Sequence, residues 1–98
     1  MEVALSVNGV PVRLTEERWG HIVQRHEALA KLKDSVLAAI ERPFAVVEGS
    51  DGELLALRRN EGWWIVVAYR EVTDADGFVI TAFLSREDPA EGRTVLWP

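Results

Sequence analysis

Both histidines of the chain lie near its N-terminus, close to two arginines. His21 and His26 carry imidazoles, which titrate near about pH 6.5 and can take or give a proton at neutral pH. Arg18 and Arg25 carry guanidinium groups, which hold phosphate oxygens well. Cleavage of RNA by attack of the 2′-hydroxyl needs a base, an acid and a cation for the charge that develops on phosphorus. His21, His26 and Arg25 are therefore candidate catalytic residues. Arg18 is a candidate substrate-binding residue.

One amphipathic helix, from Thr15 to Ala30, is predicted to carry these four side chains. Thr15 is a good N-cap because its hydroxyl can accept a hydrogen bond from an early helical N–H. Apolar residues recur at helical spacing and predict a buried stripe of Trp19, Ile22, Val23, Leu29 and Ala30. A helix turns by about 100° per residue, so His26 lies in the middle of the buried stripe. Arg18, His21 and Arg25 lie on one flank of it.

Each of these residues also has a purely structural interpretation. A helix histidine at the edge of a core, such as His26, is commonly satisfied by a backbone carbonyl. An arginine on a solvated flank, such as Arg18 or Arg25, usually pairs with a nearby carboxylate and contributes little. The surroundings of His26 separate the two interpretations. Catalysis needs an open cleft, whereas a structural role fits a ring enclosed by Trp19, Ile22 and strand residues.

The remaining chain alternates between turn signals and apolar runs. Asn8-Gly9 between two alternating segments predicts an N-terminal hairpin. A second helix is expected to begin at Asp34 and to end by Arg42, because Pro43 disfavours helical geometry in the residue before it. Strands are predicted in segments 44–48, 53–59, 63–72 and 78–85, and 94–97 would add an edge strand or cap an exposed face. Segments 63–72 and 78–85 are apolar on both faces, which predicts central strands covered on each side.

This order of elements predicts one α+β domain over residues 1–98. It consists of an N-terminal hairpin and two helices, followed by a four- to five-stranded antiparallel sheet.

Polar side chains of the two central strands are further candidates. Alternation places Thr81 and Ser85 on one strand face, as a possible hydrogen-bonding groove, although threonine in strands is usually structural. The same alternation assigns the opposite face to Phe78, Ile80, Ala82 and Leu84. If the helix packs across the strand ends, Arg70 and Arg86 would lie in the same pocket as the histidines and arginines of the helix. Otherwise they are charges at the sheet edge that deter aggregation. Tyr69 is either a buried aromatic with a polar tip or a phenol that reaches phosphate.

Composition narrows the classes of function. The 98-residue chain has no cysteine, which excludes disulfides, thiolate metal sites and thiol catalysis. The two histidines are not at the i, i+4 spacing of a helical metal pair, so neither a metal nor another cofactor is expected. No apolar run would span a bilayer and the start lacks the features of a signal peptide, so a soluble cytoplasmic protein is expected.

The net charge of −5 argues against a general nucleic-acid binder but leaves room for a small basic pocket. Acidic residues concentrate in the C-terminal third, which offers a surface for a basic protein partner.

Two sequence patterns resemble a known family. They are Leu14-Thr-Glu-Glu-Arg-Trp-x-His21-Ile-x-x-Arg25-His26 and, after a second helix that closes on a proline, Gly77-Phe-Val-Ile-Thr-Ala-Phe83. Together they resemble the phage-associated branch of the barnase–EndoU–colicin–RelE-like nuclease superfamily. That resemblance implies helices followed by a four-stranded antiparallel sheet, and metal-independent ribonuclease activity that is often toxic. It further implies acid/base roles for His26 and His21, phosphate binding by Arg25 and a sheet hydroxyl at Thr81.

Three hypotheses follow for function. The first is a metal-independent ribonuclease, associated with a phage or a toxin–antitoxin system, whose partner is RNA. The second is a non-catalytic binding module on the same scaffold, antitoxin-like or dimerising. The third is a structural part of a larger phage or mobile-element protein.

Overall fold

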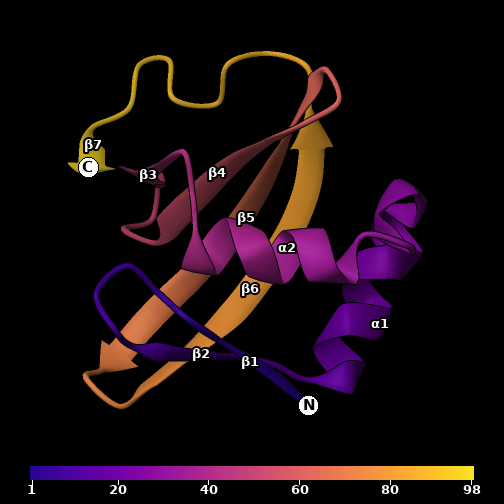
Figure 1. Ribbon diagram of the computed structural model, residues 1–98, viewed down its shortest axis with the longest axis horizontal. Helices are drawn as coiled ribbons and strands as arrows, with labels where there is room; N and C mark the ends of the chain where they lie inside the picture. Colours follow the sequence, from indigo (N-terminus) through magenta and orange to yellow (C-terminus); the bar gives the residue numbers. More distant parts are fainter.

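The computed structural model describes every residue from Met1 to Pro98 and shows an α+β fold with two helices and a seven-stranded mixed sheet (Figure 1). The predicted order of hairpin, two helices and antiparallel strands is confirmed. Neither helix contains a stretch that would serve as a membrane span. In chain order the elements are β1 Glu2–Leu5, β2 Pro11–Leu14, α1 Glu16–Arg25, a 3₁₀ turn Glu27–Leu29, α2 Lys33–Glu41, β3 Ala45–Glu48, β4 Leu54–Asn60, β5 Trp63–Thr73, β6 Asp76–Ser85 and β7 Val95–Trp97.

The sheet is larger than predicted and is not purely antiparallel. Its strand order is β1-β2-β6-β5-β4-β3-β7. β2 runs parallel to β6 and pairs with it only through Val12 opposite Gly77 and Arg13 opposite Phe78. All other neighbours are antiparallel. The two additional strands are β1 and β2, because the N-terminal hairpin joins the sheet through β2. Of the two roles predicted for segment 94–97, the edge strand is the one observed, since β7 pairs with β3.

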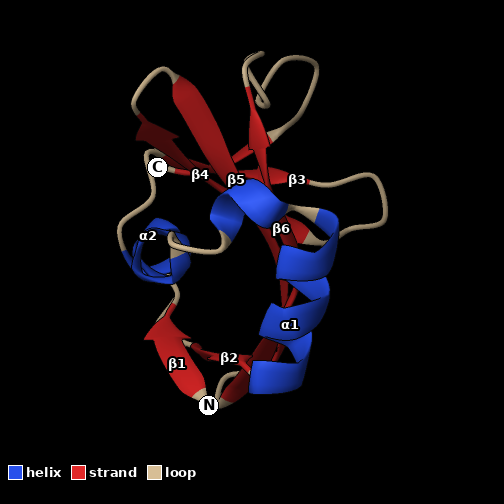
Figure 2. Ribbon diagram, turned by 90° about the vertical axis from the view of Figure 1, so that its right-hand side faces the viewer, coloured by secondary structure: helices blue, strands red, loops and turns tan.

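Apolar clusters lie on both faces of the sheet, as predicted for the central strands. The helix-side core lies under α2, which crosses one face (Figures 1 and 2), and includes Ile22, Leu29, Ile40, Ile65 and Tyr69. The opposite core is formed by Ala45, Val47, Leu55, Leu57, Val66 and Ala68, with Ala90 of the C-terminal segment packed against it. Alternate residues of β5 enter the two cores, which explains why this strand is apolar on both faces.

The start of α1 and the end of α2 agree with the prediction. The hydroxyl of Thr15 accepts a hydrogen bond from the Arg18 N–H at 3.1 Å, the expected N-cap contact. α2 ends at Glu41, two residues before Pro43. Local capping and proline chemistry therefore set these two boundaries. The predicted start of α2 is wrong: the helix begins at Lys33 with Leu32 as the N-cap residue, and Asp34 lies in its first turn without capping it.

The end of α1 does not agree with the prediction. The His26 N–H still donates to the Ile22 carbonyl at 2.8 Å, but His26 itself has left the helical region, with φ −134° and ψ 72°. The following 3₁₀ turn brings Leu29 into the helix-side core and leads the chain to α2. A single helix to Ala30 with His26 in its buried stripe is therefore wrong, because the chain turns at His26.

A β-bulge in β6 changes which of its side chains share a face. Consecutive residues of β5 lie opposite Thr81 and Val79, so Ile80 is the extra residue. Val79 consequently packs with Ala82 in the helix-side core, while Ile80 packs against the opposite core. The strict alternation predicted for this strand is wrong, because a bulge shifts the alternation by one residue.

α1 occupies the edge of β6 that β2 leaves uncovered. β2 stops pairing with β6 at Phe78, so from Val79 to Ser85 the strand has no neighbouring strand on that side. α1 lies along this edge and runs in the same direction as β6 (Figure 2). The polar flank of the helix therefore faces a strand edge that no strand covers.

Two glycine substitutions compare a crowded position, Gly77 in β6, with an open one, Gly20 in α1. A Cβ on Gly77 would lie 2.5 Å from the Arg70 carbonyl oxygen and 3.4 Å from the side chains of Val10 and Val12. We expect Gly77→Ala to lower the free energy of unfolding by about 1–3 kcal/mol, because the backbones of β5 and β6 must move apart there. Gly20 lies inside α1 with open space at its Cβ position, so Gly20→Ala should stabilise by about 0.5–1 kcal/mol. Urea unfolding measures the change in the free energy of unfolding for each variant. Equal changes for the two variants would contradict the close approach at Gly77.

An ion pair at the same junction predicts a pH dependence of stability. Arg13 donates from Nε and Nη2 to the two carboxylate oxygens of Asp76, at 2.7 and 3.1 Å. This hydrogen bonding, and the charge of Arg13, lower the pKa of Asp76 below its ordinary value. A carboxylate whose pKa is lowered by folding stabilises the folded state at pH values above the pKa that it has in the unfolded chain. This stabilisation is lost as the pH falls through the lower pKa that the carboxylate has in the folded protein. Asp76→Asn should therefore destabilise at pH 7, and the deficit relative to wild type should shrink towards about pH 2. A deficit independent of pH in urea unfolding would show that charge pairing is not involved.

Candidate functional site

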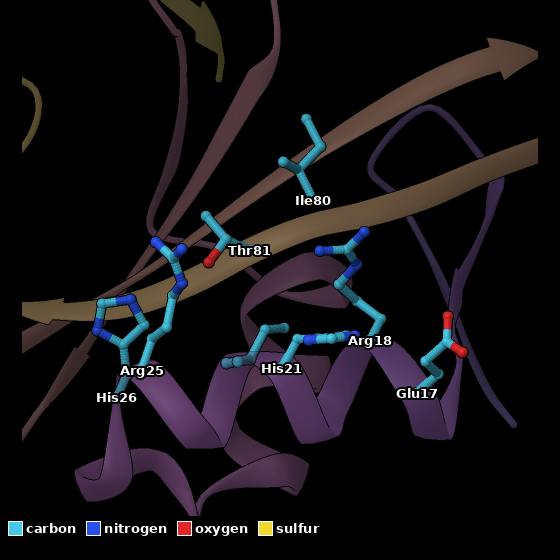
Figure 3. A pocket seen from close by; sticks show the side chains of 8 residues that line it. Glu17, Arg18, His21, Arg25, His26, Ile80 and Thr81 are labelled. Carbon is cyan, nitrogen blue, oxygen red and sulfur yellow. The ribbon is translucent and has the colours of Figure 1, made fainter.

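An open cleft of about 570 Å³ lies between α1 and β6 (Figure 3). Figure 3 shows Glu17 at one end of the cleft, and Arg25 and His26 at the other. Most lining residues are polar or charged, so the cleft presents hydrogen-bonding and charged groups to the solvent. The cleft is lined by Glu17, Arg18, His21, Ile22, Arg25, His26, Ile80 and Thr81.

Helical periodicity places three of the cationic or titratable side chains along one wall. Arg18, His21 and Arg25 are spaced three and four residues apart, so they project from the same side of α1. All three are exposed, whereas the neighbouring Ile22 is 2% exposed and anchors the helix in the helix-side core. Burial of Ile22 thus fixes the orientation in which α1 presents this wall.

His26 reaches the cleft because the helix ends at it. Its ring lies against Phe83 of β6, with 6.2 Å between ring centroids and a tilt of 40°. The residue is half-buried and lines the cleft, so the imidazole is not sealed in hydrocarbon. The structural interpretation of a histidine enclosed by Trp19, Ile22 and strand residues does not describe its position.

Thr81 contributes the opposite wall. The bulge at Ile80 brings Ile80 and Thr81 to the cleft, and the guanidinium of Arg25 points towards Thr81 (Figure 3). The remaining predicted groove residue, Ser85, does not line the cleft; its hydroxyl donates to the Glu87 carbonyl at 3.0 Å.

The two arginines of the cleft have no carboxylate partner. The ion pairs of the structure are Arg13 with Asp76, and Arg42 with Glu41. Neither Arg18 nor Arg25 donates a side-chain hydrogen bond to another residue. Their guanidinium groups are therefore available to bind an anion. The alternative interpretation, in which each arginine pairs with a nearby carboxylate, holds for neither of them.

The structure does not bring the other three predicted residues into the cleft. Tyr69 is fully buried in the helix-side core. Arg70 lies towards the far end of β5 and donates to the Asp51 carbonyl at 3.0 Å. Arg86 follows β6 and stacks on Trp63. α1 lies alongside β6 instead of across the strand ends, which explains why these side chains are separated from it.

Three cleft residues, Glu17, Ile22 and Ile80, were not predicted to line it. Ile22 was predicted only as part of the buried stripe. Glu17 precedes His21 by one helical turn, so helical spacing alone was a sufficient signal for it. Ile80 depends on the bulge, for which the sequence carries no recognisable signal.

No three potential metal ligands among His, Asp and Glu come together anywhere in the structure. No protein-family model, curated protein or solved structure matches the chain.

The burial of Tyr69 predicts the effect of removing its hydroxyl. This oxygen is buried without a hydrogen-bond partner, and burial, followed by the charge of Glu71, raises the pKa of the phenol. An unpaired buried hydroxyl costs about 1–3 kcal/mol. We expect Tyr69→Phe to leave thermal and urea stability unchanged or to raise the free energy of unfolding by up to about 1 kcal/mol. A clear loss of stability would mean that the hydroxyl has a partner in solution.

Proposed function

We propose that the cleft between α1 and β6 binds an RNA phosphodiester and cleaves it without a metal ion, by attack of the 2′-hydroxyl on the adjacent phosphorus. One observation carries the proposal. Two imidazoles and two unpaired guanidinium groups line the same open cleft, together with a hydroxyl side chain. The proposal agrees with the resemblance to the barnase–EndoU–colicin–RelE-like superfamily, and a phage or toxin–antitoxin setting belongs to the same proposal.

The reaction requires two proton transfers, and the proposal assigns them to His26 and His21. One imidazole takes the proton of the 2′-hydroxyl as its oxygen attacks phosphorus. The other gives a proton to the 5′-oxygen as the P–O5′ bond breaks. The products are a 2′,3′-cyclic phosphate and a free 5′-hydroxyl, and the two imidazoles together end with the number of protons they began with.

The remaining cleft residues act on charge and position. Arg25 lies at the His26 end and stabilises the negative charge on the non-bridging phosphoryl oxygens, while Arg18 holds the neighbouring part of the strand. The hydroxyl of Thr81 orients a phosphoryl oxygen towards Arg25. Ile22 and Ile80 supply the apolar part of the cleft lining.

A non-catalytic binding module is the second candidate, favoured by a separate observation. Glu87, Asp88 and Glu91 border a hollow of about 270 Å³ that is distinct from the cleft. A cluster of carboxylates of this kind suits a basic protein partner. In that case the cleft residues would have no role in turnover.

Substitutions in the cleft test the proposed reaction. Wild-type protein should cut single-stranded RNA in EDTA at low salt. His26→Ala should lower kcat by about 10²–10⁴-fold, because an acid/base group is lost. Arg25→Ala should lower it by about 10²–10³-fold, because charge stabilisation is lost. Gel analysis of a labelled oligoribonucleotide measures each rate.

Gln24→Ala provides the matched control, since Gln24 is exposed on the same helix and does not line the cleft. It should retain wild-type activity. Circular dichroism and thermal melts establish that each variant is folded. Folded wild-type protein that cleaves no RNA under these conditions would overturn the proposal and favour the binding module.

A further inference from the structure

We propose that a second hollow beside the cleft holds one base of the RNA whose phosphodiester enters the cleft. This Phe78 hollow has a volume of about 170 Å³ and lies against β6, where β2 ends and α1 begins. It is lined by Arg13, Thr15, Arg18, Phe78 and Val79. The inference rests on the proposed function, because it assigns a binding site to a further part of the same substrate.

The Phe78 hollow adjoins the cleft. Arg18 lines both of them, and its guanidinium reaches from α1 towards β6 (Figure 3). Phe78 and Val79 of β6 line the hollow, and the next two residues of the strand line the cleft. At about 3.3 Å per residue, Phe78 lies about 10 Å along β6 from Thr81. A nucleotide whose phosphate lies in the cleft can therefore place its base in the hollow.

Phe78 offers a flat apolar surface that the two cores do not use. Its side chain is partly exposed and belongs to neither apolar core. Its partner across the β2–β6 contact is Arg13, whereas the next residue, Val79, is 2% exposed and packs in the helix-side core. The strand thus holds the Phe78 ring beside the hollow, where it is open to a ligand. Aromatic side chains bind unpaired bases by stacking on their faces.

The charges around the Phe78 hollow suit a base better than a second phosphate. Arg13 donates to Asp76 through Nε and Nη2, so its charge is already paired. Arg18 forms no ion pair, but Glu17 stands at the same end of the cleft. A phosphate in the hollow would therefore meet one free cation with two carboxylates nearby. A base carries no charge, and its edges both donate and accept hydrogen bonds.

A base in this hollow defines the state of the RNA and not its sequence. Every base has a flat face, so a phenyl ring accepts all four of them. Bases inside a duplex are stacked on their neighbours, so they must leave the duplex before they can stack on Phe78. The hollow therefore favours RNA that is unpaired beside the cleaved bond, with little preference among bases.

Dinucleotides that cannot be cleaved test the hollow separately from turnover. The probes are a 2′-O-methyl dinucleotide and two derivatives of it, one without the 5′ base and one without the 3′ base. Calorimetric titration at low salt measures the affinity of each probe. For wild-type protein we expect removal of one of the two bases to weaken binding by about tenfold, because a stacking contact is lost.

Phe78→Leu should abolish that difference, because leucine is apolar but has no flat ring. The variant should bind the complete dinucleotide about tenfold more weakly than wild type does, and the abasic probe equally well. Phe78→Tyr keeps the ring and should bind all three probes as wild type does. Phe44→Leu is the matched control, because Phe44 is 68% exposed and lines neither the hollow nor the cleft. It should change no affinity.

Three results would overturn the proposal for variants that circular dichroism shows to be folded. The first is equal affinity of wild type for the three dinucleotides, and the second is no binding of the complete one. The third is an equal loss of affinity in Phe78→Leu for the complete and the abasic probes, since the ring would then not act through the base.

Turnover of unmodified RNA separates this proposal from the proposed reaction. Phe78→Leu should raise KM at unchanged kcat. Base-dependent binding without any cleavage would refute the catalytic proposal and leave the hollow as a base-binding site. Cleavage with a KM insensitive to Phe78→Leu would refute the base-binding site and leave the catalytic proposal standing.

Discussion

The parallel contact between β2 and β6 is the constraint on which the rest of the structure depends. It extends over only two residue pairs, and the Arg13–Asp76 ion pair links the two strands beside them. Because β2 then ends, the chain enters α1 beside the edge of β6, and the helix lies along that edge. A longer β2 would pair with β6 beyond Val79 and cover the strand edge that now borders the cleft.

Several boundaries of the fold could be predicted because they depend on local chemistry. Thr15 caps α1 through its own hydroxyl, and Pro43 stops α2, so neighbouring residues contain the information. The parallel pairing of β2 with β6 depends on contacts between distant segments, which no local pattern specifies. For segment 94–97 the local pattern predicted an edge strand or a cap, and only the contact with β3 decides for the edge strand. The bulge at Ile80 is similar, since it follows from the register of two whole strands.

The residues of the candidate site also divide into those that local sequence predicts and those that depend on how distant segments pack. Arg18, His21 and Arg25 were predicted together because helical spacing places them on one flank. His26 was predicted at the same site for the wrong reason: it reaches the cleft by ending the helix, not by occupying its buried stripe. Arg86 was predicted to join the cleft only if the helix packs across the strand ends. α1 lies alongside β6 instead, and local sequence does not specify this packing. The net charge of −5 gave no indication of the site, because the site holds only a few cations.

The central claim is that the cleft between α1 and β6 is where a phosphodiester binds. Since the chain has only two histidines, their imidazole carbon-bound protons give NMR signals that are simple to assign. Titration with a 2′-O-methyl dinucleotide, which cannot be cleaved, measures binding independently of turnover. The account predicts saturable shifts of both imidazole signals and of the amides around Arg25 and Thr81, with β3 and β7 unaffected. Saturable shifts confined to residues outside the cleft, or none at low salt, would contradict it.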